Sequence, residues 1–176
     1  VLLRVTDYLA FRIKQINESF FRAIKEVGYK GYYKGVFPVK VNQQAQVIDR
    51  IVDFGKEFDF GLEVGSKPEL LIALAHDLSS ESTIICNGIK DREFINLAIL
   101  SLKIGFKTIL VLESPRELDL IIKVSQELNV RPLLGIRVKL TNKVSGNWSQ
   151  SSGDRSAFGM SVEQVMKVIK KLKSYN

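Results

Sequence analysis

A repeat of one strand and one helix is the feature that most constrains how this chain can fold. Apolar runs rich in Val, Ile and Phe begin near Val36, Phe60, Ile84, Thr108 and Leu134, about 24 residues apart. Each run is followed by a segment in which apolar residues recur at helical spacing. Strands that alternate with helices form parallel sheets through right-handed crossovers. The repeat therefore predicts an α/β fold of five βα units, either a doubly wound sheet or part of a (βα)₈ barrel.

Three of the predicted helices have well-marked N-termini. In each, a serine is followed three residues later by Glu or Gln, the pattern of a capping box in which two side chains satisfy free N–H groups. Two of the three also carry proline at the start of the helix, where its missing N–H does no harm. The patterns are Ser66-Lys67-Pro68-Glu69, Ser114-Pro115-Arg116-Glu117 and Ser161-Val162-Glu163-Gln164. We expect helices to begin at these serines.

Two regions fall outside the repeat. Residues 6–27 have the periodicity of an amphipathic helix, which we expect to pack outside the sheet. Its apolar side consists of Leu9, Ile13, Ile16, Phe20 and Ile24. Residues 141–157, rich in Ser, Gly, Asn and Lys, form the one long loop predicted, on the rim that carries ligands in either fold. We therefore divide the chain into an N-terminal helical segment, residues 1–30, and a truncated barrel segment, residues 31–176, of a longer protein.

Composition narrows the range of functions. The formal net charge of +7 favours anionic partners such as phosphates and carboxylates. Much of the excess lies in one amphipathic segment, without the interleaved aromatics of a single-strand binding platform, so no nucleic-acid partner is expected. With no apolar run long enough to cross a bilayer and no recognisable signal peptide, we expect no membrane partner and a cytoplasmic location. The single cysteine, Cys86, and single histidine, His76, argue against a zinc site.

Strand parity turns several charges toward one region. Alternate residues of a parallel strand face opposite layers, so the apolar residues mark the side of the helices. These residues are Phe37, Val39, Val41, Phe60, Leu62, Val64, Leu134, Ile136, Val138 and Leu140. Lys40, Glu63 and Arg137, with Lys139, then point toward the barrel axis. Barrel enzymes place their chemistry at the C-terminal strand ends. Parity alone does not show that these charges form a functional site. They could also be solvated charges at the rim, or Glu63 and Arg137 could form one structural ion pair.

Several segments resemble the biosynthetic arginine decarboxylases, of the alanine-racemase-like barrel superfamily that uses pyridoxal phosphate (PLP). The first is GVFPVKVNQQ, residues 35–44, which resembles the cofactor-lysine strand of that family. FGLEVGSKPEL, residues 60–70, ICNGIKDRE, residues 85–93, and GIRVKL, residues 135–140, continue the resemblance. The loop SGNWSQSSGD, residues 145–154, and AFG, residues 157–159, discriminate best, because ornithine and diaminopimelate decarboxylases differ there. Together these segments span nearly the whole chain.

The resemblance implies a (βα)₈ barrel followed by a β-rich domain that lies outside this chain. It implies PLP bound as a Schiff base to Lys40, with Glu63 near that lysine, Arg137 close to the pyridine ring and Asn87 as a rim candidate. The family converts L-arginine to agmatine and carbon dioxide, in polyamine and spermidine biosynthesis. Magnesium, whose ligands cannot be assigned, and a homo-oligomeric full-length enzyme are implied as well. The present chain is expected to be inactive alone, because later strands and the second domain supply the remaining site residues.

Two other functions compete with this interpretation. Within the superfamily, the substrate could be ornithine, diaminopimelate or carboxynorspermidine, against which the loop at Trp148 argues. From a different class, the protein could be a non-catalytic, PLP-binding regulatory homologue. The presence of Lys40, Glu63 and Arg137 argues against that second alternative.

Overall fold

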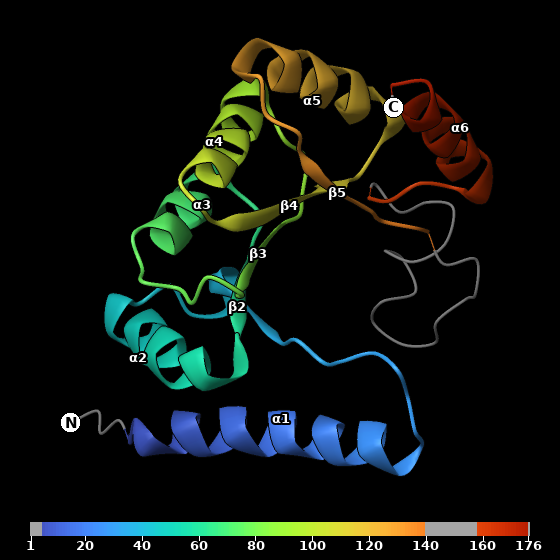
Figure 1. Cartoon of the computed structure of the whole chain (residues 1–176). Helices are drawn as coiled ribbons and strands as arrows, with labels where there is room; N and C mark the ends of the chain where they lie inside the picture. The colour runs from blue at the N-terminus through green and yellow to red at the C-terminus, as the bar shows by residue number, and fades with distance from the viewer. Residues whose placement is uncertain (1–4, 140–157, 176) are drawn as a thin grey trace, which may run out of the picture.

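The computed structural model describes residues 5–139 and 158–175 and contains one parallel five-stranded sheet (Figure 1). Its strands pair in sequential order, β1-β2-β3-β4-β5, every neighbouring pair being parallel. They are β1 Val36–Pro38, β2 Gly61–Val64, β3 Thr83–Cys86, β4 Lys107–Leu112 and β5 Leu133–Ile136. The predicted repeat is thereby confirmed. Sequential order, without the reversal of a doubly wound sheet, is the order of a (βα)₈ barrel.

Helices cover one side of this sheet. Figure 1 shows them in an arc outside the strands, from α2 around to α6, while the inner side carries no helix. The helices are α2 Ala45–Gly55, α3 Lys67–Leu74, α4 Arg92–Lys103, α5 Pro115–Leu128 and α6 Val162–Lys173. Short 3-10 turns, η1 Val39–Val41 and η2 Lys56–Phe58, follow β1 and α2. The α/β class and the partial barrel predicted from the sequence are both correct.

The core lies between the strands and the arc of helices. Fully buried strand residues on this side include Leu62, Val64, Ile84, Cys86, Leu110 and Leu112. They pack in one cluster with apolar residues of the helices, among them Ile48, Leu70, Ile95, Ile99 and Ile121. Each buried side chain of this size contributes about 1.5–3 kcal/mol. The helix side of the strands is thus closed by apolar packing, while the other side carries polar residues such as Glu63 together with apolar ones such as Ile85 and Val111.

Parity fails where the strands end. β1 stops at Pro38, so Lys40 lies in the η1 turn and not within a strand as predicted. A 3-10 turn has three residues per turn, which breaks the two-residue alternation. Val41 is consequently 68% exposed, and Val138, beyond β5, is 48% exposed, so neither faces the helix layer as expected. Leu140, which was also predicted to face the helices, lies outside the described residues.

The predicted helix starts are confirmed, but only one complete capping box is present. Ser161 accepts from the Gln164 backbone N–H, and the Gln164 side chain accepts from the Ser161 backbone N–H. Ser66 accepts from the backbone N–H of the residue three positions on, at 3.5 Å. Ser114 makes no side-chain cap hydrogen bond, so the box predicted there is wrong.

Two buried glutamates explain the missing reciprocal bonds. Glu69 and Glu117 each reach past the capping serine to the residue before it. The Gly65 backbone N–H donates to Glu69 Oε2 at 2.6 Å, and the Glu113 backbone N–H donates to Glu117 Oε2 at 2.8 Å. Both carboxylates therefore tie a helix N-terminus to the end of the preceding strand, where a free N–H would otherwise be buried.

The helix predicted over residues 6–27 is α1, Asp7–Glu26, which packs against α2 outside the sheet (Figure 1). Of the apolar side expected from the sequence, Ile13 is buried, whereas Ile16 and Phe20 remain exposed. Phe20 stacks on Tyr33, with ring centroids 3.9 Å apart. Among the described residues, none of the helices has both the length and the apolar character needed to span a membrane.

Candidate active site

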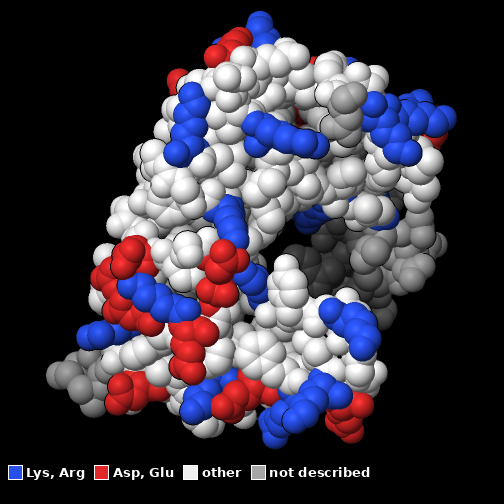
Figure 2. Space-filling model, viewed as in Figure 1, with Lys and Arg blue, Asp and Glu red and all other residues white. Residues whose placement is uncertain are grey.

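An open cavity of about 840 Å³ lies at the C-terminal ends of the strands. Figure 2 shows a hollow at the centre of the face drawn there, with Lys and Arg side chains at its margin. All four residues predicted for the site line the cavity: Lys40, Glu63, Asn87 and Arg137. Lys139, which parity also turned inward, is not among the described residues that line it. The ends of β1, β2, β3 and β5 thus contribute polar side chains to one space.

Lys40 and Glu63 form an ion pair across the ends of β1 and β2. Lys40 Nζ lies 3.4 Å from Glu63 Oε2, and it donates a long hydrogen bond of 3.5 Å to Oε1. The two side chains differ in environment, because Lys40 is 61% exposed whereas Glu63 is 8% exposed. A buried carboxylate is thereby placed against an amine that stays open to the cavity.

Asn87 fixes one oxygen of this carboxylate and leaves the other available. Its Nδ2 donates to Glu63 Oε1 at 3.0 Å. Glu63 Oε2 is buried and accepts no hydrogen bond from any residue that the structure describes. A buried acceptor without a donor is costly, and such atoms often mark a functional position.

Arg137 pairs with Glu113 and not with Glu63. Its Nη1 donates to Glu113 Oε1 at 3.1 Å, and its guanidinium carbon lies 5.3 Å from the centre of the Phe158 ring. The alternative of a structural Glu63–Arg137 pair is therefore wrong. The Arg137 side chain remains 48% exposed, so N–H groups are left facing the cavity.

Glu113 was missed by the sequence reasoning. It follows β4 directly and is buried, and besides Arg137 its carboxylate accepts from the backbone N–H groups of Gly88, at 2.9 Å, and Gly159, at 3.1 Å. The sequence contains no parity signal for it, because Ile109, Leu110, Val111 and Leu112 make β4 apolar on both faces. The structure shows that Thr108, Leu110 and Leu112 are the buried positions, which places Glu113 on the side of the axis.

A second lysine, Lys90, was also missed, and it is fully enclosed. Its Nζ donates to the backbone carbonyls of Gly88, at 2.5 Å, and Val111, at 2.6 Å, and lies 3.4 Å from Glu117 Oε2. Burial lowers the pKa of Lys90, and the nearby Glu117 carboxylate opposes that change. Lys90 lies in the turn between β3 and α4, where neither strand nor helix periodicity could single it out.

Cys86 behaves as the small apolar residue expected from the sequence. It ends β3 on the helix side and is fully buried. Burial raises the pKa of its thiol to about 12, which keeps it protonated at neutral pH. In the described part of the chain, no three His, Cys, Asp or Glu side chains are grouped so that they could hold a metal ion.

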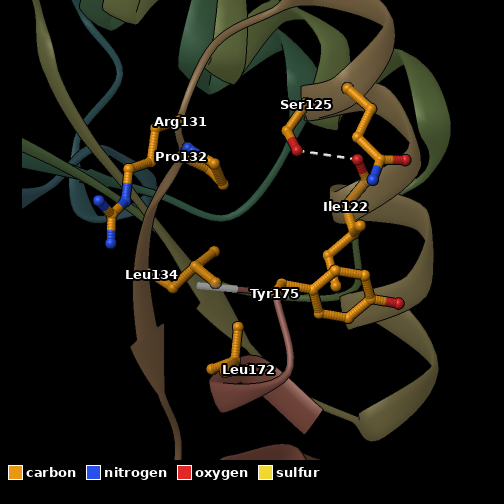
Figure 3. A pocket seen from close by; sticks show the side chains of 8 residues that line it. Ile122, Ser125, Arg131, Pro132, Leu134, Leu172 and Tyr175 are labelled. Atoms are coloured by element: carbon orange, nitrogen blue, oxygen red, sulfur yellow. Dashed lines mark hydrogen bonds between the residues drawn. The ribbon is translucent and has the colours of Figure 1, made fainter.

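A second cavity, of about 780 Å³, lies away from these groups, between α5, α6 and the start of β5. Figure 3 shows Ile122, Leu134, Leu172 and Tyr175 around it, while the Arg131 guanidinium points away. The Ser125 hydroxyl donates to the Ile122 carbonyl at 2.8 Å, as the dashed line marks. The described residues that line this cavity include no carboxylate, whereas Lys40 and Glu63 both line the cavity at the strand ends, which is therefore the candidate site.

Comparisons with known proteins identify the family and agree with the fold. Residues 13–176 match the family described as pyridoxal-dependent decarboxylase, pyridoxal binding domain. The chain is 50% identical over 176 residues to the biosynthetic arginine decarboxylase of Prochlorococcus marinus (strain MIT 9301), which is 100% of this chain and 27% of that relative. The chain thus spans little more than a quarter of the length of the curated relatives it matches.

Two solved structures share the fold. The biosynthetic arginine decarboxylase of Campylobacter jejuni has a TM-score of 0.84 and 33% identity, over 96% of this chain and 27% of that one. A diaminopimelate decarboxylase from M. jannaschii, solved with L-lysine, has a TM-score of 0.71 over 95% of this chain and 38% of its own. Its identity of 24% makes it evidence for the fold alone. The chain belongs to the pyridoxal-dependent decarboxylase family, as part of the pyridoxal-binding domain.

Proposed function

We propose that the protein containing this chain is a PLP-dependent arginine decarboxylase, which converts L-arginine to agmatine and carbon dioxide for polyamine biosynthesis. The observation that carries the proposal is the open amine of Lys40, held 3.4 Å from the buried carboxylate of Glu63 in a cavity that a guanidinium also enters. Identity of 50% to a protein named biosynthetic arginine decarboxylase supports arginine as the substrate.

The residues of the cavity fit PLP, which is an anionic aldehyde. Lys40 provides an exposed primary amine, and Arg137 provides positive charge on a side chain that is half exposed. The unsatisfied Glu63 Oε2 can accept a hydrogen bond from a group that enters beside Lys40. When bound, PLP supplies an electron sink for the electron pair that remains on the substrate after its carboxylate leaves as carbon dioxide.

Each residue then has a distinct task. Lys40 would hold the cofactor covalently through its amine, once that amine has given up a proton. Glu63 stabilises positive charge at the nitrogen it faces, and Asn87 keeps Glu63 in that orientation. Arg137 places its charge beside the cofactor ring. In this proposal Lys40 and Glu63 are catalytic residues, and Lys40, Arg137 and Asn87 bind the cofactor.

Other features of the full protein remain predictions from the sequence. Residues 31–176 are proposed to be the first part of the barrel, followed in the full protein by a β-rich domain, with residues 1–30 as the helical segment. Homo-oligomerisation is proposed on the family resemblance, and a cytoplasmic location stays the expectation drawn from the sequence. Magnesium is retained only as an implied cofactor, because the described residues offer no ligand cluster for it.

A substrate panel tests the proposed activity. The full-length protein, loaded with PLP, should release carbon dioxide from L-arginine far faster than from ornithine, diaminopimelate or carboxynorspermidine. Agmatine should appear in equal amount. Preference for one of the other three substrates would replace arginine by that amino acid, and release from none of the four would favour the regulatory homologue.

A further inference from the structure

Glu113 joins three segments at the edge of the cavity. Its carboxylate, immediately after β4, receives one donor from the β3–α4 turn, one from beyond β5 and one from the segment before α6. These donors are the Gly88 backbone N–H, Arg137 Nη1 and the Gly159 backbone N–H. A carboxylate that is only 2% exposed needs such donors, because an unpaired buried charge is very costly.

The arrangement around Arg137 shows what these bonds determine. One side of the guanidinium contacts the Glu113 carboxylate, and the Phe158 ring lies 5.3 Å from its central carbon. The Met160 backbone N–H donates to the Arg137 carbonyl at 2.8 Å, so the segment that carries Phe158 runs beside Arg137. Glu113 binds this segment too, through Gly159. It therefore fixes both the guanidinium and the aromatic ring beside it.

The backbone at Gly159 lies close to the Arg137 side chain and limits the positions that this side chain can adopt. Gly159 has a φ of +84°, and a Cβ added there would lie 3.3 Å from Arg137 Cγ. A side chain at this position would press on the arginine as well as strain the backbone. The guanidinium is therefore held on its protein side by a charge and a ring, the stem of the side chain lies against the Gly159 backbone, and the side chain is half open on the cavity side.

We propose that Glu113 is a positioning residue of the cofactor site, which holds the Arg137 guanidinium at the cavity and keeps the Phe158–Met160 segment against it. The inference rests on the proposed function, since PLP is the group that Arg137 would contact. Glu113 itself lies behind Arg137 and acts through it.

Glu117 provides a matched control for a merely structural role. It is also a buried glutamate, in the first turn of α5, and it accepts from the Lys90 and Glu113 backbone N–H groups. No described contact joins its carboxylate to Arg137. Glu113→Gln and Glu117→Gln remove the same charge at almost the same shape, but only the first removes the partner of the guanidinium.

The experiment is a double-mutant cycle in the full-length protein, read by PLP affinity in an absorbance titration and by melting temperature. Glu113→Gln should weaken PLP binding by about tenfold, the size expected for a charged hydrogen bond. In an Arg137→Ala background the same substitution should weaken it by less than about twofold, since coupled residues are not additive. Glu117→Gln should lower the melting temperature yet leave PLP affinity within about twofold. Equal effects of Glu113→Gln with and without Arg137 would overturn the inference.

A second measurement does not depend on the cofactor. In a crystal structure of the Glu113→Gln protein without PLP, the Arg137 guanidinium should have left the position it occupies beside Glu113. An unmoved guanidinium overturns the inference even if the protein binds no PLP, a result that would separately contradict the proposed function. If Glu113→Gln does not fold, Glu113→Asp, which keeps the charge but withdraws it by one methylene, enters the same cycle with the same criteria.

Discussion

The molecule contains two lysine–glutamate pairs with the same separation and opposite surroundings. Lys40 Nζ and Lys90 Nζ each lie 3.4 Å from an Oε2 atom, of Glu63 and Glu117 respectively. The Lys90 side chain is 0% exposed and also donates to two backbone carbonyls. The Lys40 side chain is 61% exposed and, within the described part of the chain, pairs with Glu63 alone.

The contrast separates a lysine that completes the structure from one that is open to chemistry. Lys90 has an acceptor for each of its three N–H bonds, and it joins the β3–α4 turn to β4 and α5. Lys40 leaves donors unused at a cavity, beside a carboxylate oxygen that is itself unsatisfied. The ion-pair distance is the same in both pairs and does not distinguish them. They differ in whether the polar atoms around the lysine have hydrogen-bond partners.

The largest expected effect is on catalysis, at the exposed Lys40–Glu63 pair. Lys40→Arg keeps the positive charge but removes the primary amine, so the full-length variant should lose arginine decarboxylation by several orders of magnitude. Its melting temperature without PLP should stay close to that of the wild type, because the side chain is exposed. Lys40→Ala should lose activity to a similar degree. A variant that decarboxylates at nearly the wild-type rate would show that Lys40 is no more reactive than Lys90.

The next largest effect is on stability, at the buried Lys90–Glu117 pair. Lys90→Met removes the ion-pair partner of the buried Glu117 carboxylate and the side-chain donor to two carbonyls, and should lower the free energy of unfolding by about 3 kcal/mol. Lys40→Met is the matched substitution and should change it by less than about 1 kcal/mol, as for an exposed pair. Urea titration of both variants measures the difference. Equal losses would remove the distinction between the pairs.

A smaller effect should appear in the pH dependence of stability. Because burial lowers the pKa of Lys90 below 10.5, the unfolded chain binds more protons than the folded one between the two values. The contribution of Lys90 to stability should therefore increase as the pH rises toward 10.5. The stability difference between the wild type and Lys90→Met should grow over that range. A difference that shrinks would mean that the Glu117 and Glu113 carboxylates outweigh burial.

The smallest effect concerns Cys86, whose thiol pKa is influenced by one residue of each pair, Lys90 and Glu63. Burial raises the pKa of the thiol to about 12, with Lys90 acting to lower it and Glu63 to raise it. Iodoacetamide at pH 8 should leave Cys86 unmodified in the native protein and alkylate it rapidly in urea, as mass spectrometry would show. Slow alkylation should appear in Lys90→Met, since that region opens more often. Rapid alkylation of the native wild type would contradict the closed packing around β3.

The sequence predicted the sheet, the order of its elements and the meeting of four site residues at one cavity. Strict alternation in β2 made Glu63 predictable, because its neighbours Leu62 and Val64 are fully buried. Prediction failed where alternation stops, at the η1 turn that holds Lys40 and exposes Val41.

What the sequence could not supply is the pattern of contacts between distant segments. The partner of Arg137 is Glu113, 24 positions away, and no periodicity relates the two. Lys90 lies in a turn, so its burial follows from packing against β4 and α5 and not from its place in a repeat. The roles assigned to Lys40, Glu63, Asn87 and Arg137 remain predictions, since their meeting in one cavity does not by itself test them.

The attachment site of the cofactor tests the central claim most directly. The full-length protein would be incubated with PLP, treated with borohydride to reduce the bond between cofactor and protein, digested and mapped by mass spectrometry. We predict one pyridoxyl group, on Lys40, and none on Lys90. A pyridoxyl group on another lysine, or a protein that carries none, would contradict the assignment of Lys40 as the lysine that binds PLP.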